Sequence, residues 1–259
     1  MQQDKHIEWY YQWQHYSDDE EFLFFDWIFP RNVEDFRDMR VLDAGCGPGH
    51  HTRIVAPVAK SVTALDLNTA ELARNKLATL DNVEIVAADI ATYQTDNLYD
   101  VIYCIGVIHH TDSPEKTFQN LLQLCKIDGI IIIWCYSEEG NTLVRYIVEP
   151  LRKMFLYDRS RRFLSRFSRI ITACMYPIIY TLYRLPLSFL PFYEYFENFR
   201  NLPFERNVLN VFDKLNAPQT DFISHKRIKS WFNDNDFYDV SIQLYKGVSW
   251  RASGRVKSK

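Results

Sequence analysis

The chain alternates between apolar runs and amphipathic stretches over its first half. Five runs of mostly apolar and β-branched residues have the composition of strands, at 41–42, 61–66, 83–88, 99–106 and 130–134. Three stretches between them repeat apolar residues with the spacing of a helix, at 50–58, 69–80 and 117–125. Strands that alternate with helices in this order predict a doubly wound α/β fold with a parallel sheet.

The pattern changes at both ends of the chain. Residues 239–245 and 248–254 flank the turn Lys246-Gly247 and predict an antiparallel hairpin at the edge of the sheet. Residues 1–30 are rich in aromatic side chains and predict one or two amphipathic helices, which either pack against the sheet or cover a ligand at its edge. We therefore expect a mostly parallel, seven-stranded sheet with an antiparallel C-terminal hairpin and an N-terminal helical cap.

A glycine-rich turn follows the first predicted strand. Gly45, Gly47 and Gly49 stand at every second position, and the helix predicted over 50–58 begins directly after them. Glycine suits such a turn because its backbone adopts positive φ angles and because no Cβ keeps a ligand away from the backbone. The amide groups and the dipole of the following helix face the same ligand. The turn therefore predicts a nucleotide-like ligand.

The spacing of these glycines separates two classes of cofactor. A dinucleotide fingerprint is G-x-G-x-x-G/A, whose last position counted from Gly45 would be His50. The sequence instead has G-x-G-x-G, with Asp43 two residues before the first glycine. This pattern resembles the signature of class I S-adenosylmethionine-dependent methyltransferases of the small-molecule type. The resemblance implies a Rossmann-like methyltransferase domain over 31–136 and 217–259 that uses S-adenosyl-L-methionine as its cofactor.

Acidic residues end the second and third predicted strands. Asp66 lies 21 residues beyond Gly45, where a strand tip places a carboxylate that can accept both ribose hydroxyls. The resemblance implies that Asp89 accepts a hydrogen bond from the adenine amino group and that Ile90 covers the ring. Further residues beside the same turns complete the predicted cofactor site, namely Asp43, Gly45, Cys46, Gly47, Gly49, Leu67 and Ile105.

Two histidines, His109 and His110, follow the fourth predicted strand at the same edge of the sheet. A histidine with a pKa near neutrality can take a proton from an acceptor hydroxyl, which makes either residue a candidate catalytic base. A structural role, in which the ring holds the loop by backbone hydrogen bonds, is the alternative. No metal is expected, because two adjacent histidines without nearby cysteines or further histidines lack a plausible ligand set.

Residues 137–216 interrupt the alternation and predict a helical insert after the fifth strand. Seven basic residues and one acid lie within 151–169, whereas 170–192 carries Arg184 as its only charge. A membrane-spanning helix is not expected, because prolines and Arg184 interrupt the apolar stretch. The insert is interpreted as a lid, a homodimer arm, an element on an anionic membrane surface or a nucleic-acid contact. Candidate acceptor contacts, for which packing or surface placement is the simpler explanation, are Tyr193, Tyr195, Arg200 and Asp213.

Composition narrows the choice of acceptor. The net charge of −3 argues against a general nucleic-acid partner, and an aromatic content of 15% favours an apolar ligand. Five cysteines without a C-x-x-C pair indicate reduced thiols, and the polar N-terminus predicts a cytoplasmic protein, with peripheral membrane contact if the insert lies on a bilayer. We expect methyl transfer to a small, apolar or lipid-linked acceptor. The alternatives are a soluble sugar or peptide side chain as acceptor, or a non-catalytic module that binds the cofactor.

Overall fold

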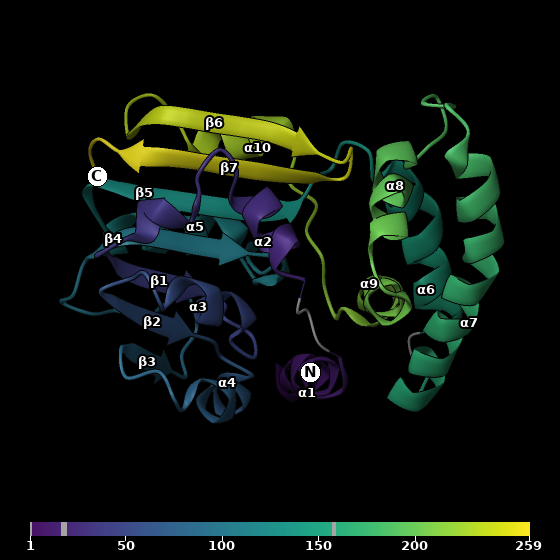
Figure 1. Cartoon of the computed structure of the whole chain (residues 1–259), viewed down its shortest axis with the longest axis horizontal. Coiled ribbons are helices and arrows are strands. Elements are labelled where there is room, and N and C mark those ends of the chain that lie inside the picture. Colours follow the sequence, from purple (N-terminus) through teal and green to yellow (C-terminus); the bar gives the residue numbers. More distant parts are fainter. Residues whose placement is uncertain (1, 17–19, 157–158) are drawn as a thin grey trace.

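Figure 1 shows the computed structural model of the chain, which describes residues 2–16, 20–156 and 159–259. One seven-stranded sheet has the order β3-β2-β1-β4-β5-β7-β6. The strands are β1 (Arg40–Ala44), β2 (Ser61–Leu65), β3 (Val83–Val86), β4 (Tyr99–Ile105), β5 (Cys125–Tyr136), β6 (Phe237–Tyr245) and β7 (Ser249–Val256). The first five run parallel, and β7 pairs antiparallel with both β5 and β6. The predicted sheet with its antiparallel hairpin is confirmed.

Helices cover both faces of this sheet, because successive strand residues point to opposite sides. Outside the insert, the described α-helices are α1 (Gln2–His15), α2 (Glu21–Ile28), α3 (His50–Val55), α4 (Ala70–Leu77), α5 (Pro114–Leu124) and α10 (His225–Trp231). Val101 and Tyr103 of β4 belong to the apolar cluster that α2 and α3 complete. Ile102 and Cys104 belong to the cluster under α5 and α10. The core of the domain therefore lies on both sides of the central strands.

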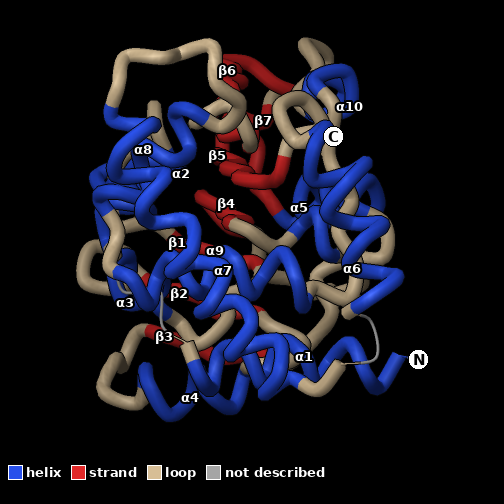
Figure 2. The backbone as a smooth tube through the Cα atoms, turned by 90° about the vertical axis from the view of Figure 1, so that its right-hand side faces the viewer, coloured by secondary structure: helices blue, strands red, loops and turns tan. Residues whose placement is uncertain are grey.

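The insert forms a layer beyond the carboxyl ends of the parallel strands (Figure 1). Its described helices are the π-helical turn η3 (Val144–Val148), α6 (Glu149–Phe155), α7 (Arg161–Thr181), the 3-10 helix η4 (Leu182–Arg184), α8 (Tyr193–Asn201) and α9 (Phe204–Asn216). Ile179, Phe199, Val211 and Leu215 form an apolar cluster that joins α7, α8 and α9. Figure 2 looks onto this layer, with α7 in front of the strands. The insert therefore has a small core of its own.

The N-terminal cap consists of two helices with different positions. Leu23 and Phe24 of α2 are buried against the sheet. α1 instead lies beyond the strand ends, next to α9 (Figure 1), where the amide of Gln12 donates to Asp213 at 3.3 Å. An ion pair of 2.8 Å between Glu8 and Arg161 joins α1 to α7. One cap helix therefore packs on the sheet, and the other covers its edge.

The fifth strand is longer than the sequence predicts. β5 begins at Cys125, which pairs with Tyr99 of β4, and the register shifts before Val101 pairs with Ile130. The polar residues Lys126 and Asp128 lie within this irregular part of the strand. Within the part of the chain that the structure describes, no helix has the length and apolar character needed to cross a bilayer.

Candidate active site

The glycine turn between β1 and α3 adopts the backbone conformation that its sequence predicts. The φ angles are +90° at Gly45, +55° at Gly47 and +89° at Gly49. A Cβ at Gly45 would lie 2.6 Å from Val107, and one at Gly49 would lie 2.6 Å from Leu77. A larger residue at either position would therefore combine backbone strain with a steric clash.

Asp66 lies at the tip of β2 and connects this turn to α4. Its Oδ2 accepts the N–H of Gly47 at 3.0 Å, and its Oδ1 accepts the N–H groups of Asn68 and Thr69, each at 2.8 Å. Burial raises the pKa of Asp66, although these hydrogen bonds favour the ionised form. A carboxylate has room for about four hydrogen bonds, so Asp66 retains capacity for a ligand hydroxyl. Its contact with ribose stays a prediction.

Asp43 lies behind the glycine turn rather than in its open side. The side chain is buried, and Thr52 of α3 donates to its Oδ2 at 2.6 Å. Burial raises the pKa of Asp43 to about 7, while the hydrogen bond from Thr52 opposes this shift. The structure therefore places Asp43 as a support that ties α3 to β1. A direct contact with the cofactor, which the sequence predicts, does not follow from this position.

The loop after β3 brings Asp89 and Ile90 to the same edge. Oδ1 of Asp89 accepts the N–H of Ala91 at 2.8 Å, which tightens the turn. The amide of Asn120 donates to the carbonyl oxygens of Ile90 and Tyr93, at 2.7 Å and 2.9 Å. Because α5 holds the loop in this way, Asp89 stays exposed while Ile90 is buried beside the site.

These turns open into one cavity of about 710 Å³, a volume typical of small-molecule sites. The residues of the predicted cofactor site that line it are Gly45, Cys46, Gly47, Asp66, Leu67, Asp89, Ile90 and Ile105. Gly49 and Asp43 lie behind this surface. Trp13 of α1 covers the turn, with ring atoms 3.8 Å from the place of a Cβ on Gly47. The structure thus brings three separate loops of the sheet together around one space.

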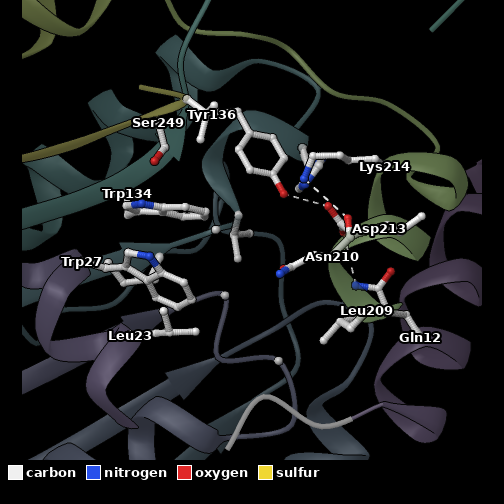
Figure 3. Close-up of a pocket in the computed structure, with 18 of the residues that line it drawn as sticks. Gln12, Leu23, Trp27, Trp134, Tyr136, Leu209, Asn210, Asp213, Lys214 and Ser249 are labelled. Atoms are coloured by element: carbon white, nitrogen blue, oxygen red, sulfur yellow. Dashed lines mark hydrogen bonds between the residues drawn. The ribbon is translucent and has the colours of Figure 1, made fainter. Parts of the chain in front are cut away.

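The cavity continues past the glycine turn between an apolar side and the insert. Leu23, Trp27 and Trp134 form its apolar wall (Figure 3). The ring centres of Trp27 and Trp134 are 4.7 Å apart. Side chains of α7 and α8, including Met175 and Phe196, line the far part of the cavity. This compartment suits an acceptor with an apolar body.

The two candidate histidines differ in their access to the cavity. His110 lines it, and its Nδ1 lies 2.7 Å from the carbonyl oxygen of Gln219. A carbonyl only accepts, so Nδ1 carries the hydrogen and Nε2 is the basic nitrogen. Burial lowers the pKa of His110, and the Asp213 carboxylate opposes this shift.

His109 is fully buried and does not line the cavity. The centre of its ring lies 4.5 Å from the ring centre of Tyr136 and 4.1 Å from that of His110. Burial also lowers the pKa of His109, well below its ordinary value. Of the two predicted bases, the structure leaves His110 in a position to meet an acceptor, while His109 supports the loop by packing.

Residues 42–133, from β1 into β5, match the family described as a methyltransferase domain. This match agrees with the seven-stranded sheet and with the glycine turn at its carboxyl edge. The matched residues form a methyltransferase domain with the class I fold. The matched segment contains every residue predicted for the cofactor, and it leaves the cap and the insert outside.

Curated methyltransferases match less than half of this chain. The ubiquinone biosynthesis O-methyltransferase of Rickettsia prowazekii is 33% identical over 108 residues, which are 39% of this chain and 42% of the relative. The trans-aconitate 2-methyltransferase of Klebsiella pneumoniae is 30% identical over 128 residues, 47% of this chain and 49% of the relative. The chain thus spans less than half the length of these relatives.

A solved structure extends the likeness in fold to most of the chain. An O-methyltransferase family protein from Burkholderia thailandensis superposes with a TM-score of 0.55 and 12% identity, over 92% of this chain and 57% of that protein. At this identity the likeness concerns the fold.

A polar wall faces the apolar wall of the cavity (Figure 3). It consists of Gln12, Tyr136, Asn210, Asp213 and Lys214. Tyr136 donates to Oδ2 of Asp213 at 2.9 Å, and Gln12 donates to Oδ1 at 3.3 Å. The Lys214 ammonium lies 5.2 Å from the centre of the Tyr136 ring. Three elements, α1, β5 and α9, therefore meet at this wall.

The sequence identifies part of this wall. Asp213 and Tyr195 are among the candidate acceptor contacts, and both line the cavity. Tyr193 and Arg200 instead donate to carbonyl oxygens within the insert. Tyr136 was missed, although it ends the fifth strand at the edge where ligands are expected. Gln12, Asn210 and Lys214 lie in amphipathic helices, whose pattern does not distinguish a cavity wall from a packed face.

Proposed function

We propose that the chain transfers a methyl group from S-adenosylmethionine to a small acceptor with an apolar body. The observation that carries this proposal is the single cavity that contains both the glycine turn and the apolar wall with His110. A cofactor on the turn and an acceptor between the two walls would lie next to each other. Methyl transfer depends mainly on such placement of the two reactants.

The residues at the turn fit S-adenosylmethionine. The turn at Gly45 and Gly47 lets a ligand approach the backbone, and Asp66 offers carboxylate oxygens at the edge of the cavity. Asp89 and Ile90 lie on the loop after the next strand, in the position that we assign to the adenine. Bound there, S-adenosylmethionine supplies a methyl carbon that leaves its sulfur, with the C–S electron pair staying on sulfur.

His110 acts as the base in this proposal. Its neutral form is favoured by burial, and Nε2 is the nitrogen that can accept a proton. As the acceptor oxygen bonds to the methyl carbon, its hydroxyl proton passes to Nε2 of His110. The hydrogen bond from Nδ1 to Gln219 orients the ring and stabilises the proton on it.

The outer surface of the insert supports a lipid-linked acceptor. Apolar residues recur every three or four positions along η3 and α6, which defines one face of a helix. This face points to solvent, and its members are Leu143, Tyr146, Ile147, Leu151, Met154 and Phe155. Met154 is 72% exposed and Phe155 is 59% exposed. Leu143 of this face also lines the cavity, together with Val144 and Val148.

The insert that carries this apolar face also exposes basic residues. Lys153 of α6 and Arg162 and Arg166 of α7 are exposed on the same layer of the molecule. Apolar side chains beside basic ones suit the surface of an anionic membrane, where each basic residue contributes about 1 kcal/mol. We propose that the insert rests on such a membrane and that the acceptor reaches the cavity from it.

The methyl-transfer proposal is tested by turnover. Wild-type protein with S-adenosylmethionine and a panel of alkyl-chain phenols and carboxylic acids is expected to produce S-adenosylhomocysteine. His110→Ala is expected to bind S-adenosylhomocysteine as the wild type does and to lose most of the turnover. A wild type that binds the cofactor but methylates nothing in the panel would support the non-catalytic alternative.

The membrane proposal is tested by flotation with vesicles of phosphatidylcholine alone or mixed with phosphatidylserine. We expect the wild type to float with the anionic vesicles, and Met154→Glu together with Phe155→Glu to abolish flotation. Ile127→Glu, an exposed apolar position of β5 outside the insert, is the matched control and should float. If this apolar face instead forms a homodimer interface, light scattering will show that the wild type is a dimer and that the double variant is a monomer.

A further inference from the structure

The polar wall of the cavity presents donor groups whose orientation is fixed from behind. Asn210 and Lys214 are four positions apart on α9, so their side chains share one face of the helix. Both line the cavity. Neither residue has a part in binding the cofactor or in taking the proton, so their role in the proposed reaction is open.

The orientation of the Asn210 amide follows from its partner Arg206. A guanidinium can only donate, and Nη1 of Arg206 donates to Oδ1 of Asn210. The Nδ2 group of Asn210 must then be the end that faces away from Arg206. In Figure 3 this nitrogen points into the space between the polar wall and the apolar wall. Arg206 is itself 9% exposed, so the arrangement is held inside the wall.

Lys214 provides the second donor. Its Nζ donates to the hydroxyl of Tyr195 at 3.1 Å and to the backbone oxygen of Asn210 at 3.4 Å. An ammonium has three hydrogens, so one remains for a ligand. The rings of Tyr136 and Tyr195 lie 5.2 Å and 5.1 Å from Nζ, which keeps the charge beside the cavity.

The one carboxylate of the polar wall does not use these donors. Each oxygen of Asp213 accepts a hydrogen bond from another side chain, Tyr136 on one and Gln12 on the other. The donors of Asn210 and Lys214 therefore stay directed at the cavity. Two donors on one wall and an apolar wall opposite them match an amphiphile with an oxygen that accepts hydrogen bonds.

We propose that Asn210 and Lys214 form a subsite for a carboxylate of an acceptor with an apolar body. The positive charge of Lys214 favours a carboxylate over an uncharged oxygen, because charge-assisted hydrogen bonds are the stronger ones. The subsite rests on the proposed function, since it orients the acceptor beside His110.

The experiment uses two probes of equal chain length, decanoate and decanol, with the full chain. Binding is followed by tryptophan fluorescence, because Trp27 and Trp134 form the opposite wall. We expect the wild type to bind decanoate at least about tenfold more tightly than decanol, the effect of one charge-assisted hydrogen bond. Equal affinity for the two probes would overturn the proposal.

Variants test whether Asn210 and Lys214 cause the preference for decanoate over decanol. Asn210→Asp keeps an oxygen for Arg206 but replaces the donor by an acceptor, and it should reduce the decanoate preference to about one. Lys214→Met should do the same. Lys226→Met removes the same charge from the exposed face of α10 and should keep the preference. A preference that survives in both wall variants, or that Lys226→Met removes equally, would contradict the subsite.

The same samples are titrated with S-adenosylhomocysteine, and the probe titrations are repeated without it. A chain that fails to bind S-adenosylhomocysteine contradicts the proposed function, while its preference between the probes still decides the subsite. A chain that binds S-adenosylhomocysteine but does not distinguish the probes contradicts the subsite alone.

Discussion

The two ends of the cavity are built in different ways. The cofactor end consists of backbone turns and carboxylates that directly follow strands of one sheet. The acceptor end consists of side chains from the cap, the sheet and the insert, and in its polar wall the hydrogen-bonded pair Gln12 and Asp213 is separated by 201 positions. Local conformation therefore fixes the first end, whereas the second depends on how the cap and the insert pack. A substitution at one end should leave the other intact.

The largest effect that separates the two ends is expected at His110. His110→Ala should lower turnover by roughly 10²–10⁴-fold, the contribution of a general base, and leave S-adenosylhomocysteine affinity unchanged. Because burial lowers the pKa of His110, wild-type turnover should be constant near pH 7 and fall as the pH drops through that lowered pKa. Turnover is measured by stopped assays across pH, and S-adenosylhomocysteine affinity is measured by calorimetry. An alanine variant with full turnover would exclude His110 as the base.

A substitution at Gly45 should damage the cofactor end. Gly45→Ala combines a φ of +90° with a Cβ 2.6 Å from Val107. The backbone strain alone costs about 1–2 kcal/mol, and with the clash we expect about a hundredfold weaker binding of S-adenosylhomocysteine. Gly247→Ala is the matched control, because φ is +69° there and no atom lies within 4 Å. If both variants lose affinity to a similar extent, the loss in Gly45→Ala comes from destabilisation of the whole fold and not from damage to the cofactor end.

The carboxylates of the cofactor end should differ in importance. Asp66 accepts three backbone hydrogen bonds and lies in the cavity wall, so Asp66→Ala should weaken S-adenosylhomocysteine binding by tenfold or more, about the effect of one lost charged hydrogen bond. Asp89 is exposed, and Asp89→Ala should have a smaller effect. Unchanged affinity in both variants would contradict the assignment of this end to the cofactor.

The smallest predicted effect concerns stability against pH. Burial lowers the pKa values of His109 and His110, so below the ordinary histidine pKa the unfolded chain binds protons that the folded chain does not. The contribution of each histidine to stability should therefore fall as the pH drops below about 6.5, by up to about 1.4 kcal/mol per pH unit, while the raised pKa of Asp43 acts in the opposite direction. Urea unfolding should show a weaker dependence in His109→Leu. An identical dependence in the variant and the wild type would contradict this attribution.

The sequence predicts the sheet and the cofactor end because their signals are local. Glycines at 45, 47 and 49 and an acid after the second strand are readable without knowledge of distant contacts. Asp43 shows the limit of such reading, since its spacing from the glycines does not reveal that it faces Thr52 behind the turn. A residue next to a motif supports the turn or binds the ligand, and only the direction of the side chain distinguishes the two roles.

The acceptor end could not be predicted in the same way. Asn210 and Lys214 belong to an amphipathic helix, and the sequence does not show which neighbour covers its polar positions. The solvent-facing apolar face with Met154 and Phe155 could not be predicted for a related reason. Its spacing is that of an ordinary buried helix face, and the structure reveals that this face is turned to solvent.

Calorimetric titration with S-adenosylhomocysteine tests the central claim most directly when wild type, Gly45→Ala and Lys214→Met are compared. We predict that wild type and Lys214→Met bind with the same affinity, whereas Gly45→Ala binds far more weakly. A wild type that binds NAD but not S-adenosylhomocysteine, or a Lys214→Met variant that loses S-adenosylhomocysteine, would contradict a cavity with a cofactor end and a separate acceptor end.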